Sequence, residues 1–242
     1  MTGRPGVGAG WRRAISEVVT IVVGISIALG ADAAWEEHVD RVDERAALRR
    51  LHDDFQRSTA LLDSVTALHE ADLASLERLM ELILSAGDPA GSYEVPDSIL
   101  IGVYRTSAWT PPMGSVTSLL NSGDLRLIRN DSLRAELTAW PEVVSNIAGR
   151  ESASRAHYEQ FQLPLTHEYV PWASLMLRSG PHHYGVASRA SGDYRGLLNS
   201  LSFENTIEWR VSKEVEILAE YTITERRLNV ILELLARELG AS

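Results

Sequence analysis

One apolar segment near the N-terminus constrains the fold of this chain more than any other feature. Between Arg13 and Asp32 the sequence reads AISEVVTIVVGISIALGA, in which Glu17 is the single charge. About 18 residues at a rise of 1.5 Å per residue nearly cross a hydrocarbon core of about 30 Å. Trp11 and Trp35 bracket the segment and would lie about 36 Å apart on one helix, at the two interfacial belts of a bilayer. The segment therefore predicts a membrane anchor.

The charges on either side of the segment indicate its orientation. Basic residues precede it and acidic residues follow it: Arg4, Arg12 and Arg13, then Asp32, Glu36 and Glu37. Positively charged flanks stay in the cytoplasm. We therefore expect three parts, which are a disordered cytoplasmic tail over 1–10, a transmembrane anchor over 11–35 and an extracytoplasmic helical bundle over 36–242. This predicts a single-pass protein of the bacterial inner membrane, with its main domain in the periplasm.

A cleaved signal peptide is the alternative to an anchor. The basic start, the apolar run and Ala31-Asp32-Ala33 loosely resemble such a peptide and its cleavage site. We favour the uncleaved anchor because its apolar run is longer than the roughly 7–15 residues of a signal peptide, and helix-compatible sequence continues past it. Within the anchor, Gly24 and Ala28 form a pair of small residues four apart, which can let two membrane helices approach.

Composition excludes several classes of partner and site. The chain has 33 acidic and 23 basic residues, and the part after the anchor carries 31 and 20, for a net charge of −11. Such a domain repels nucleic acid and anionic lipid headgroups. The chain has no cysteine, which excludes a disulfide framework, a thiolate metal site and a cysteine nucleophile.

Helical periodicity dominates the rest of the chain, and no strand-like alternation is sustained, which predicts an all-α fold. We expect one helix from Trp11 to Ala86, stopped by Gly87-Asp88-Pro89. Shorter helices are expected in the middle of the chain, over 99–109, over 115–121, and from 131 to Gln162 with a kink or break at Pro141. Residues 179–196 are the most loop-like part of the domain.

Two seven-residue repeats predict the packing of the long helices. In the first helix the two rows are Leu48, Phe55, Leu62, His69, Leu76, Ile83 and Leu51, Ser58, Val65, Asp72, Leu79, Ala86. In the C-terminal helix they are Ile207, Glu214, Tyr221, Leu228, Leu235 and Val211, Leu218, Glu225, Leu232, Leu239. Repeats of this kind form coiled-coil or bundle seams. The matching lengths favour an antiparallel pair in which residue 86 lies near 201 and residue 48 near 239.

Three stretches of the sequence resemble an uncharacterised bacterial family of single-pass membrane proteins, known as a domain of unknown function. The first runs from Glu17-Val18-Val19 through Gly24-Ile25-Ser26-Ile27-Ala28-Leu29 to Trp35-Glu36-Glu37. The second runs from Leu119 to Asn130 and reads LLNSGDLRLIRN, with Leu133-Arg134 following it. The third is the C-terminal helix, which matches in character. One departure is Gly30 to Ala34, where members usually carry amides. The resemblance implies a topology and a helical fold but brings no catalytic residues.

The central motif has a structural interpretation of its own. Gly123 can adopt the left-handed conformation that ends a helix, and Asn130 can cap the next one. We favour a structural turn over a binding loop here.

Sequence motifs for catalysis and metal binding are missing. The Glu-x-x-His and His-Glu-x-x-His patterns, the nucleophile elbow and the phosphate-binding glycine loop do not occur. His182-His183 lies in the loop-like region and reads as solvated rather than metal-binding. We therefore expect no enzyme activity, cofactor or metal.

Polar residues interrupt both seams. His69, Asp72, Glu214, Tyr221 and Glu225 could form a buried polar layer that fixes the register of the helices or responds to pH. We favour the alternative, in which the first seam drifts onto Leu68 and Leu73 and leaves both polar residues exposed.

These features together favour an interaction or scaffolding module without catalytic activity. It would be held in the membrane lipid by the anchor and would bind a protein partner or a second copy of itself, and no nucleic acid. The alternative function is a small-ligand-binding sensory module that signals through a membrane partner, because a tail of about 13 residues is too short for an output domain.

Overall fold

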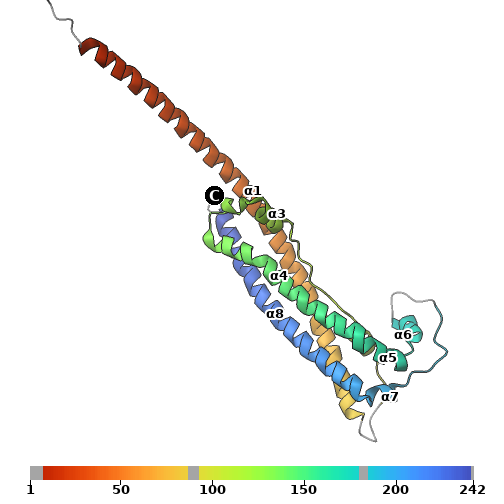
Figure 1. Cartoon of the computed structure of the whole chain (residues 1–242). Coiled ribbons are helices and arrows are strands. Elements are labelled where there is room, and N and C mark those ends of the chain that lie inside the picture. Colours follow the sequence, from red (N-terminus) through yellow and green to blue (C-terminus); the bar gives the residue numbers. More distant parts are fainter. Residues whose placement is uncertain (1–7, 87–92, 180–184, 241–242) are drawn as a thin grey trace, which may run out of the picture.

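The structure is a computed structural model that describes residues 8–86, 93–179 and 185–240, without the side chains of 8–10, 12–16, 19–21 and 179. These residues form helices and connecting turns and contain no strand, which confirms the predicted all-α class. Three long helices make up most of the described chain: α1 (Gly8–Ser85), α4 (Asp131–His157) and α8 (Leu201–Gly240) (Figure 1).

The short elements complete the bundle at its two ends. They are α2 (Asp97–Val103), α3 (Gly114–Ser122), the 3₁₀ turn η1 (Asp124–Leu127), the π-helical segment η2 (Tyr158–Gln162), α5 (Leu163–Tyr169), α6 (Trp172–Ser179) and α7 (Tyr194–Leu198). α3 and η1 lie where α1 enters the bundle, and α5, α6 and α7 lie at the far end (Figure 1).

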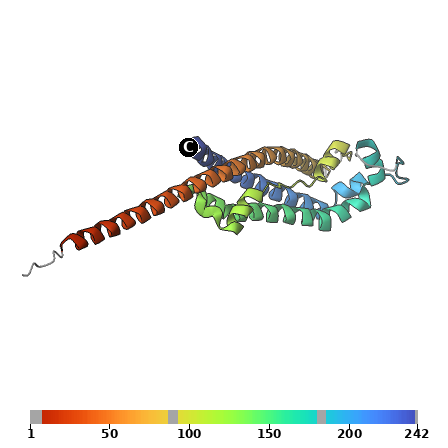
Figure 2. The same ribbon diagram turned by 90° about the horizontal axis from the view of Figure 1, so that it is seen from above.

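Helix α1 is much longer than the bundle it joins. Its 78 residues correspond to about 117 Å at 1.5 Å per residue. Its first part projects from the bundle without contact to another helix in either view (Figures 1 and 2). The contacts of α1 with the rest of the domain begin near Glu37 and Glu44, which both bind Arg129.

The helix begins at Gly8, so the expected disordered tail over 1–10 is wrong for residues 8–10. Residues 1–7 lie outside the described residues. So does the predicted stop at Gly87-Asp88-Pro89, although Ser85 as the last residue of α1 agrees with its position. Among the residues whose side chains are described, no helix is both long and apolar enough to cross a bilayer. The predicted anchor includes residues 12–16 and 19–21, which lie outside that set.

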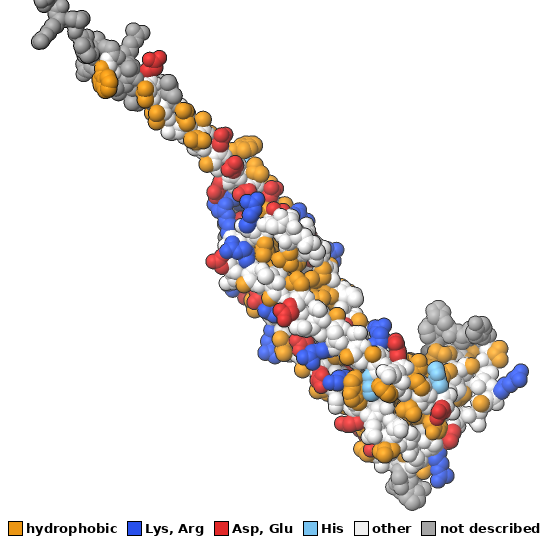
Figure 3. Space-filling model, viewed as in Figure 1, with side chains coloured by type: hydrophobic (Ala, Val, Ile, Leu, Met, Phe, Trp, Pro, Cys, Tyr) orange, Lys and Arg blue, Asp and Glu red, His pale blue; other side chains and the backbone are white. Residues whose placement is uncertain are grey.

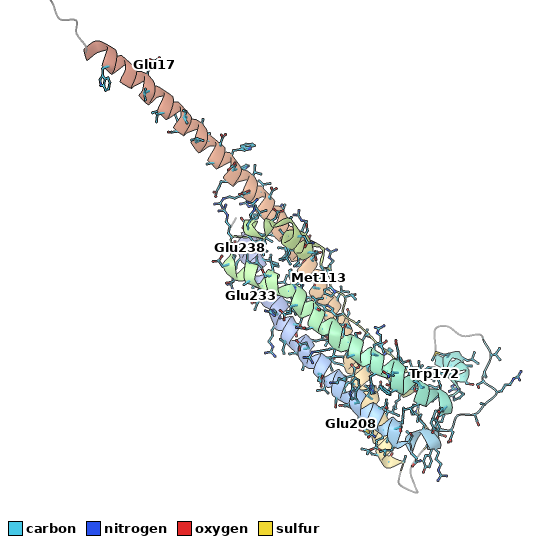
Figure 4. All side chains as sticks on the ribbon, viewed as in Figure 1. Glu17, Met113, Trp172, Glu208, Glu233 and Glu238 are labelled. Atoms are coloured by element: carbon cyan, nitrogen blue, oxygen red, sulfur yellow. The ribbon has the colours of Figure 1, made fainter. Side chains whose placement is uncertain are left out.

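Inside the bundle, α8 lies alongside α1, and α4 packs against α8. The start of α8 lies beside the end of α1, and Glu238 near the end of α8 lies where α1 enters the bundle (Figure 4). All twelve residues predicted for the two seam rows of α1 are buried. For α8, the row from Ile207 to Leu235 is buried as predicted.

The second seam row predicted for α8 is wrong by one position. Val211, Leu218, Leu232 and Leu239 are only half-buried. The residues that are buried instead are Phe203, Arg210, Ile217, Thr224 and Ile231. On a helix, the residues three and four positions after a given residue are both its neighbours. Here the buried row lies three positions after the Ile207 row, whereas the predicted row lies four positions after it.

The segment between α3 and α4 forms the predicted turn. Gly123 has φ of 78° and ends α3 in the left-handed region. The side chain of Asn130 accepts a hydrogen bond of 3.0 Å from the Leu133 amide at the start of α4. Pro141 lies inside α4 without ending it. Helix α2 stops at Val103, earlier than the predicted residue 109.

The α4 helix continues to Gln162 through a π-helical turn that the sequence did not predict. In this segment the Leu163 amide donates to the Tyr158 carbonyl, five residues back, so one turn is widened. Such turns occur frequently at functional sites. Here the turn brings the buried side chain of Gln162 into the centre of the domain.

Candidate functional site

The core of the bundle consists of two apolar clusters. The first includes Leu48 to Val65 of α1 together with Ile217 to Leu235 of α8. The second includes Leu76 to Ala86 of α1 with Phe203 and Ile207 of α8. Between these clusters both helices present charged and polar side chains to each other instead of apolar ones. We call this group, together with the side chains from other elements that bind it, the polar layer. Its members are His69 and Asp72 of α1, Arg210, Glu214 and Tyr221 of α8, Glu151 of α4, Gln162 of η2, and Arg105, which follows α2.

His69 and Glu214 are at the centre of the polar layer. His69 Nδ1 lies 2.5 Å from Glu214 Oε2, and the two side chains are 4% and 3% exposed. On the other side, Arg210 Nη2 donates to Glu214 Oε1 over 3.3 Å. The Glu214 carboxylate therefore has a partner for each oxygen, one from α1 and one from its own helix.

Gln162 connects this pair to the π-helical turn. Its Oε1 accepts from Arg210 Nη1 over 3.1 Å, and its Nε2 donates to the Val103 carbonyl over 2.9 Å. The guanidinium of Arg210 also lies over the Tyr158 ring, 5.6 Å from its centroid. Arg210 thus joins α8 to the π-helical turn, and Gln162 joins that turn to the end of α2.

Asp72 and Arg105 form a second ion pair at the edge of the layer. Arg105 Nη2 lies 2.7 Å from Asp72 Oδ1, and the Asp72 side chain is 2% exposed while that of Arg105 is 43% exposed. Burial raises the pKa of Asp72 above its ordinary value, and the Arg105 charge opposes that rise. The nearby charge of Glu214 raises the pKa of Asp72 further.

Tyr221 and Glu151 form the third part of the layer. The Tyr221 hydroxyl donates to Glu151 Oε1, and the Trp109 amide donates to the same oxygen over 2.9 Å. The Tyr221 ring meets the His69 ring edge to face at 5.3 Å between centroids. Burial and the adjacent Glu151 raise the pKa of the Tyr221 hydroxyl, so it remains a proton donor.

The structure thus brings together four of the five residues that the sequence singled out. His69, Asp72, Glu214 and Tyr221 are buried, so the interpretation that the seam drifts onto Leu68 and Leu73 is wrong. Leu68 is instead 41% exposed. The inclusion of Glu225 is also wrong, because its side chain is exposed and Thr224 takes the buried position.

Sequence reasoning missed Arg105, Glu151, Gln162 and Arg210. Arg210 had one available signal, because it stands four residues before Glu214, where opposite charges pair on a helix. Glu151 and Gln162 gave no such signal, because their partners are 42 or more residues away in the sequence.

The polar layer is packed rather than open. The described grooves include one of about 250 Å³ that Tyr221 and Glu225 line from outside, together with Leu62 and Glu70. His69, Asp72 and Glu214 do not line this groove or three others in the described part of the chain. That part also contains no group of three or more histidine and acidic side chains that could hold a metal ion. The arrangement joins α1, α4, α8 and the π-helical turn through buried hydrogen bonds and ion pairs.

The residues predicted for the anchor lie on the projecting part of α1. Trp11 and Trp35 are 71% and 69% exposed, and the side chains of Glu17 and Ala28 are exposed as well. A side chain at Gly24 would meet no atom within 4 Å. His182 and His183 lie outside the described residues.

No protein-family profile matches the chain, and neither a curated protein nor a solved structure is significantly similar to it.

Proposed function

We propose that this protein is a membrane-anchored helical interaction module whose bundle lies outside the cytoplasmic membrane. The observation that carries the proposal is the exposed apolar surface of the projecting part of α1. Six aliphatic residues there are 51–66% exposed: Val18, Val22, Val23, Ile25, Ile27 and Leu29. Figure 3 shows apolar side chains along this part of the helix and mixed charges over the bundle. Because such surface is unfavourable in water, it calls for a lipid or protein environment.

The position of the charges supports the direction of insertion. Arg12 and Arg13 precede the apolar segment, and the acidic residues other than Glu17 start at Asp32. Under the positive-inside rule, this favours an N-terminus in the cytoplasm and a bundle in the periplasm. Because α1 continues from the segment into the core without a break, a partner that moves the anchor would also move the bundle.

The polar layer supports a structural role for the bundle rather than a binding cavity. We infer that α1 and α8 pair antiparallel, as the contact of His69 with Glu214 and the place of Glu238 suggest. In such a pair a buried polar layer has one correct register, because slipping the helices would leave buried charges unpaired. The outer surface would then be held in a fixed shape for a partner. The small-ligand alternative has less support, since Tyr221 is the one buried member of the layer that lines the groove beside it, and His69, Asp72 and Glu214 do not line that groove.

Membrane association is tested by fractionating a Gram-negative host that expresses the full chain. We expect the chain in the membrane pellet after an alkaline carbonate wash. Val22→Arg combined with Ile25→Arg should move it to the soluble fraction, because an arginine near the centre of a spanning helix costs about 2.5–3.5 kcal/mol. Val230→Arg is the matched control, since Val230 is 48% exposed on the bundle and should leave the distribution unchanged. A parent chain that washes off would contradict the proposal.

The orientation is tested with single cysteines, because the chain has none of its own. A membrane-impermeant maleimide added to spheroplasts should label Ser212→Cys on the exposed surface of α8 and should not label Thr2→Cys before the segment. Labelling of Thr2→Cys alone would place the bundle in the cytoplasm and overturn the proposed topology.

A further inference from the structure

The projecting part of α1 carries a single face of small and apolar side chains that the bundle does not use. We call it the stalk stripe, and its members are Gly24, Ala28, Ala31, Trp35, Val39 and Val42. Their side chains are exposed, with Trp35 at 69%, Val42 at 52% and Val39 at 40%. Val39 and Val42 lie beyond the proposed membrane segment, where lipid would not cover them. Membrane insertion therefore leaves part of this stripe unexplained.

The spacing of the stalk stripe differs from that of the bundle seam. Its members follow at steps of four, three, four, four and three, so Ala28 and Ala31 recur eleven residues later as Val39 and Val42. An eleven-residue repeat corresponds to about 3.67 residues per turn, close to the period of a straight helix. The stripe consequently stays on one face from Gly24 to Val42. A second straight helix could follow it over this whole length.

The stripe also points away from the bundle. Glu37 and Glu44, which bind Arg129 of the bundle, lie on the opposite side of α1 when successive residues turn by about 100°. The next residue of the series, Ala46, is half-buried and lines a groove with Leu119 of α3. The free face therefore ends at Val42, where the bundle begins.

Charged side chains border the stripe with opposite signs on its two sides. Asp32, Glu36 and Asp43 lie along one border, and His38 and Arg45 lie along the other. Within the described residues, none of these five takes part in an ion pair. When two parallel helices pack around a two-fold axis, the left border of one faces the right border of the other. Acidic residues would then meet basic ones, whereas antiparallel packing would bring like charges together.

We propose that the stalk stripe is the seam of a parallel homodimer, and that its occupant is the same stripe of a second copy of this chain. The inference rests on the proposed function in one respect, because a shared membrane holds two copies in the parallel orientation. Small residues would let the backbones approach in the anchor. Trp35, Val39 and Val42 would then cover each other between the membrane and the bundle, with His38 of each copy near Asp43 of the other.

Single-cysteine crosslinking of the full chain in membranes tests this seam. Val39→Cys and Val42→Cys place a thiol on the stripe, and Ala33→Cys and Asp40→Cys place one on the opposite side of the same helix as matched controls. All four positions are exposed, so the bundle should fold in each variant. With a mild oxidant, the two stripe variants should give several-fold more covalent dimer than the two controls.

Two readouts keep the outcomes separate. Equal crosslinking at all four positions, or a crosslinked product whose mass differs from twice the chain, would overturn the dimer. Adding Val42→Glu to Val39→Cys should abolish the dimer and leave thermal unfolding of the bundle unchanged. An undiminished dimer would also overturn the proposed seam.

The carbonate wash of the same membranes reports on the anchor independently. A chain that stays in the pellet without a stripe-specific dimer refutes only the dimer, and one that washes off but crosslinks on the stripe refutes only the anchor.

Discussion

His69 of α1 and Glu214 of α8 are 145 residues apart in the sequence, yet Nδ1 of the histidine lies 2.5 Å from Oε2 of the glutamate. Both side chains are almost fully buried between the two apolar clusters of the core. His69→Leu would leave Glu214 with Arg210 as its one remaining charged partner. Removing one member of a buried pair costs about 3–5 kcal/mol, so we expect a loss near the lower end of that range in the free energy of unfolding.

A double-mutant cycle with His69→Leu and Glu214→Gln, measured by urea unfolding of the full chain in detergent, isolates the interaction. We expect a coupling free energy of about 1–3 kcal/mol, because residues in direct contact are not additive. Additive effects of the two substitutions would show that the pair contributes nothing of its own to the stability of the fold.

Tyr221→Phe removes the hydroxyl that donates to Glu151 while keeping the ring against His69. We expect a loss of about 1.5–3 kcal/mol in the free energy of unfolding, because the acceptor is a buried carboxylate. Trp109 would continue to donate its amide to Glu151, which limits the loss. Glu225→Gln, four residues further along the same helix and exposed, serves as control and should change stability by less than about 0.5 kcal/mol. Equal effects in the two variants would argue against a stabilising role for this hydroxyl.

Asp72 should make the stability of the bundle depend on pH. Burial raises its pKa in the folded state, so protonated Asp72 is favoured by folding and the ionised form is disfavoured. The stabilising contribution of this group is therefore complete below its ordinary pKa of 3.8 and is lost as the pH rises through the raised value. Asp72→Asn keeps an oxygen for Arg105 but cannot titrate.

Relative to the parent chain, the Asp72→Asn variant should thus show its largest gain in the free energy of unfolding at neutral pH. This gain should shrink on acidification towards pH 3.8. Urea unfolding at a series of pH values measures the difference. A difference between variant and parent that does not change with pH would refute the raised pKa of Asp72.

The seams show which parts of the fold could be predicted from sequence. The apolar positions of the repeat in α1 were predicted over its full length, because a seven-residue period indicates which face is buried. The burial of His69 and Asp72 was not predicted, because we favoured a seam that drifts away from these polar residues. In α8 the second row was misplaced because two of the truly buried positions, Arg210 and Thr224, are polar, whereas the competing row offered leucines. The hydrophobic pattern alone therefore predicted the row that begins at Val211 instead of the buried row that includes Arg210.

The polar layer shows why the site was only partly predicted. Whether a charged residue is buried depends on the partner it meets, and Gln162 and Glu151 meet theirs across 48 and 70 residues of chain. The π-helical turn that carries Gln162 has no reliable sequence pattern. By contrast, Gly123 and Asn130 were assigned because a left-handed helix end and an N-terminal cap depend on local chemistry.

Gly102 in α2 offers a sharp test of how closely this short helix packs on α1. A Cβ added at Gly102 would lie 2.7 Å from the Cβ of Ser75, too close for two carbon atoms. Gly102→Ala should therefore cost about 1–3 kcal/mol through overpacking, despite the better helix propensity of alanine. Gly149→Ala in α4 is the matched control, since its added Cβ meets nothing within 4 Å, and it should stabilise the chain by about 0.5–1 kcal/mol. Ser75→Gly removes the clashing atoms. When Gly102→Ala is added to Ser75→Gly, it should therefore cost much less stability than it does in the parent chain. Thermal unfolding followed by circular dichroism measures all four chains, and equal gains for the two alanine variants would mean that α2 packs more loosely on α1 than the structure has it.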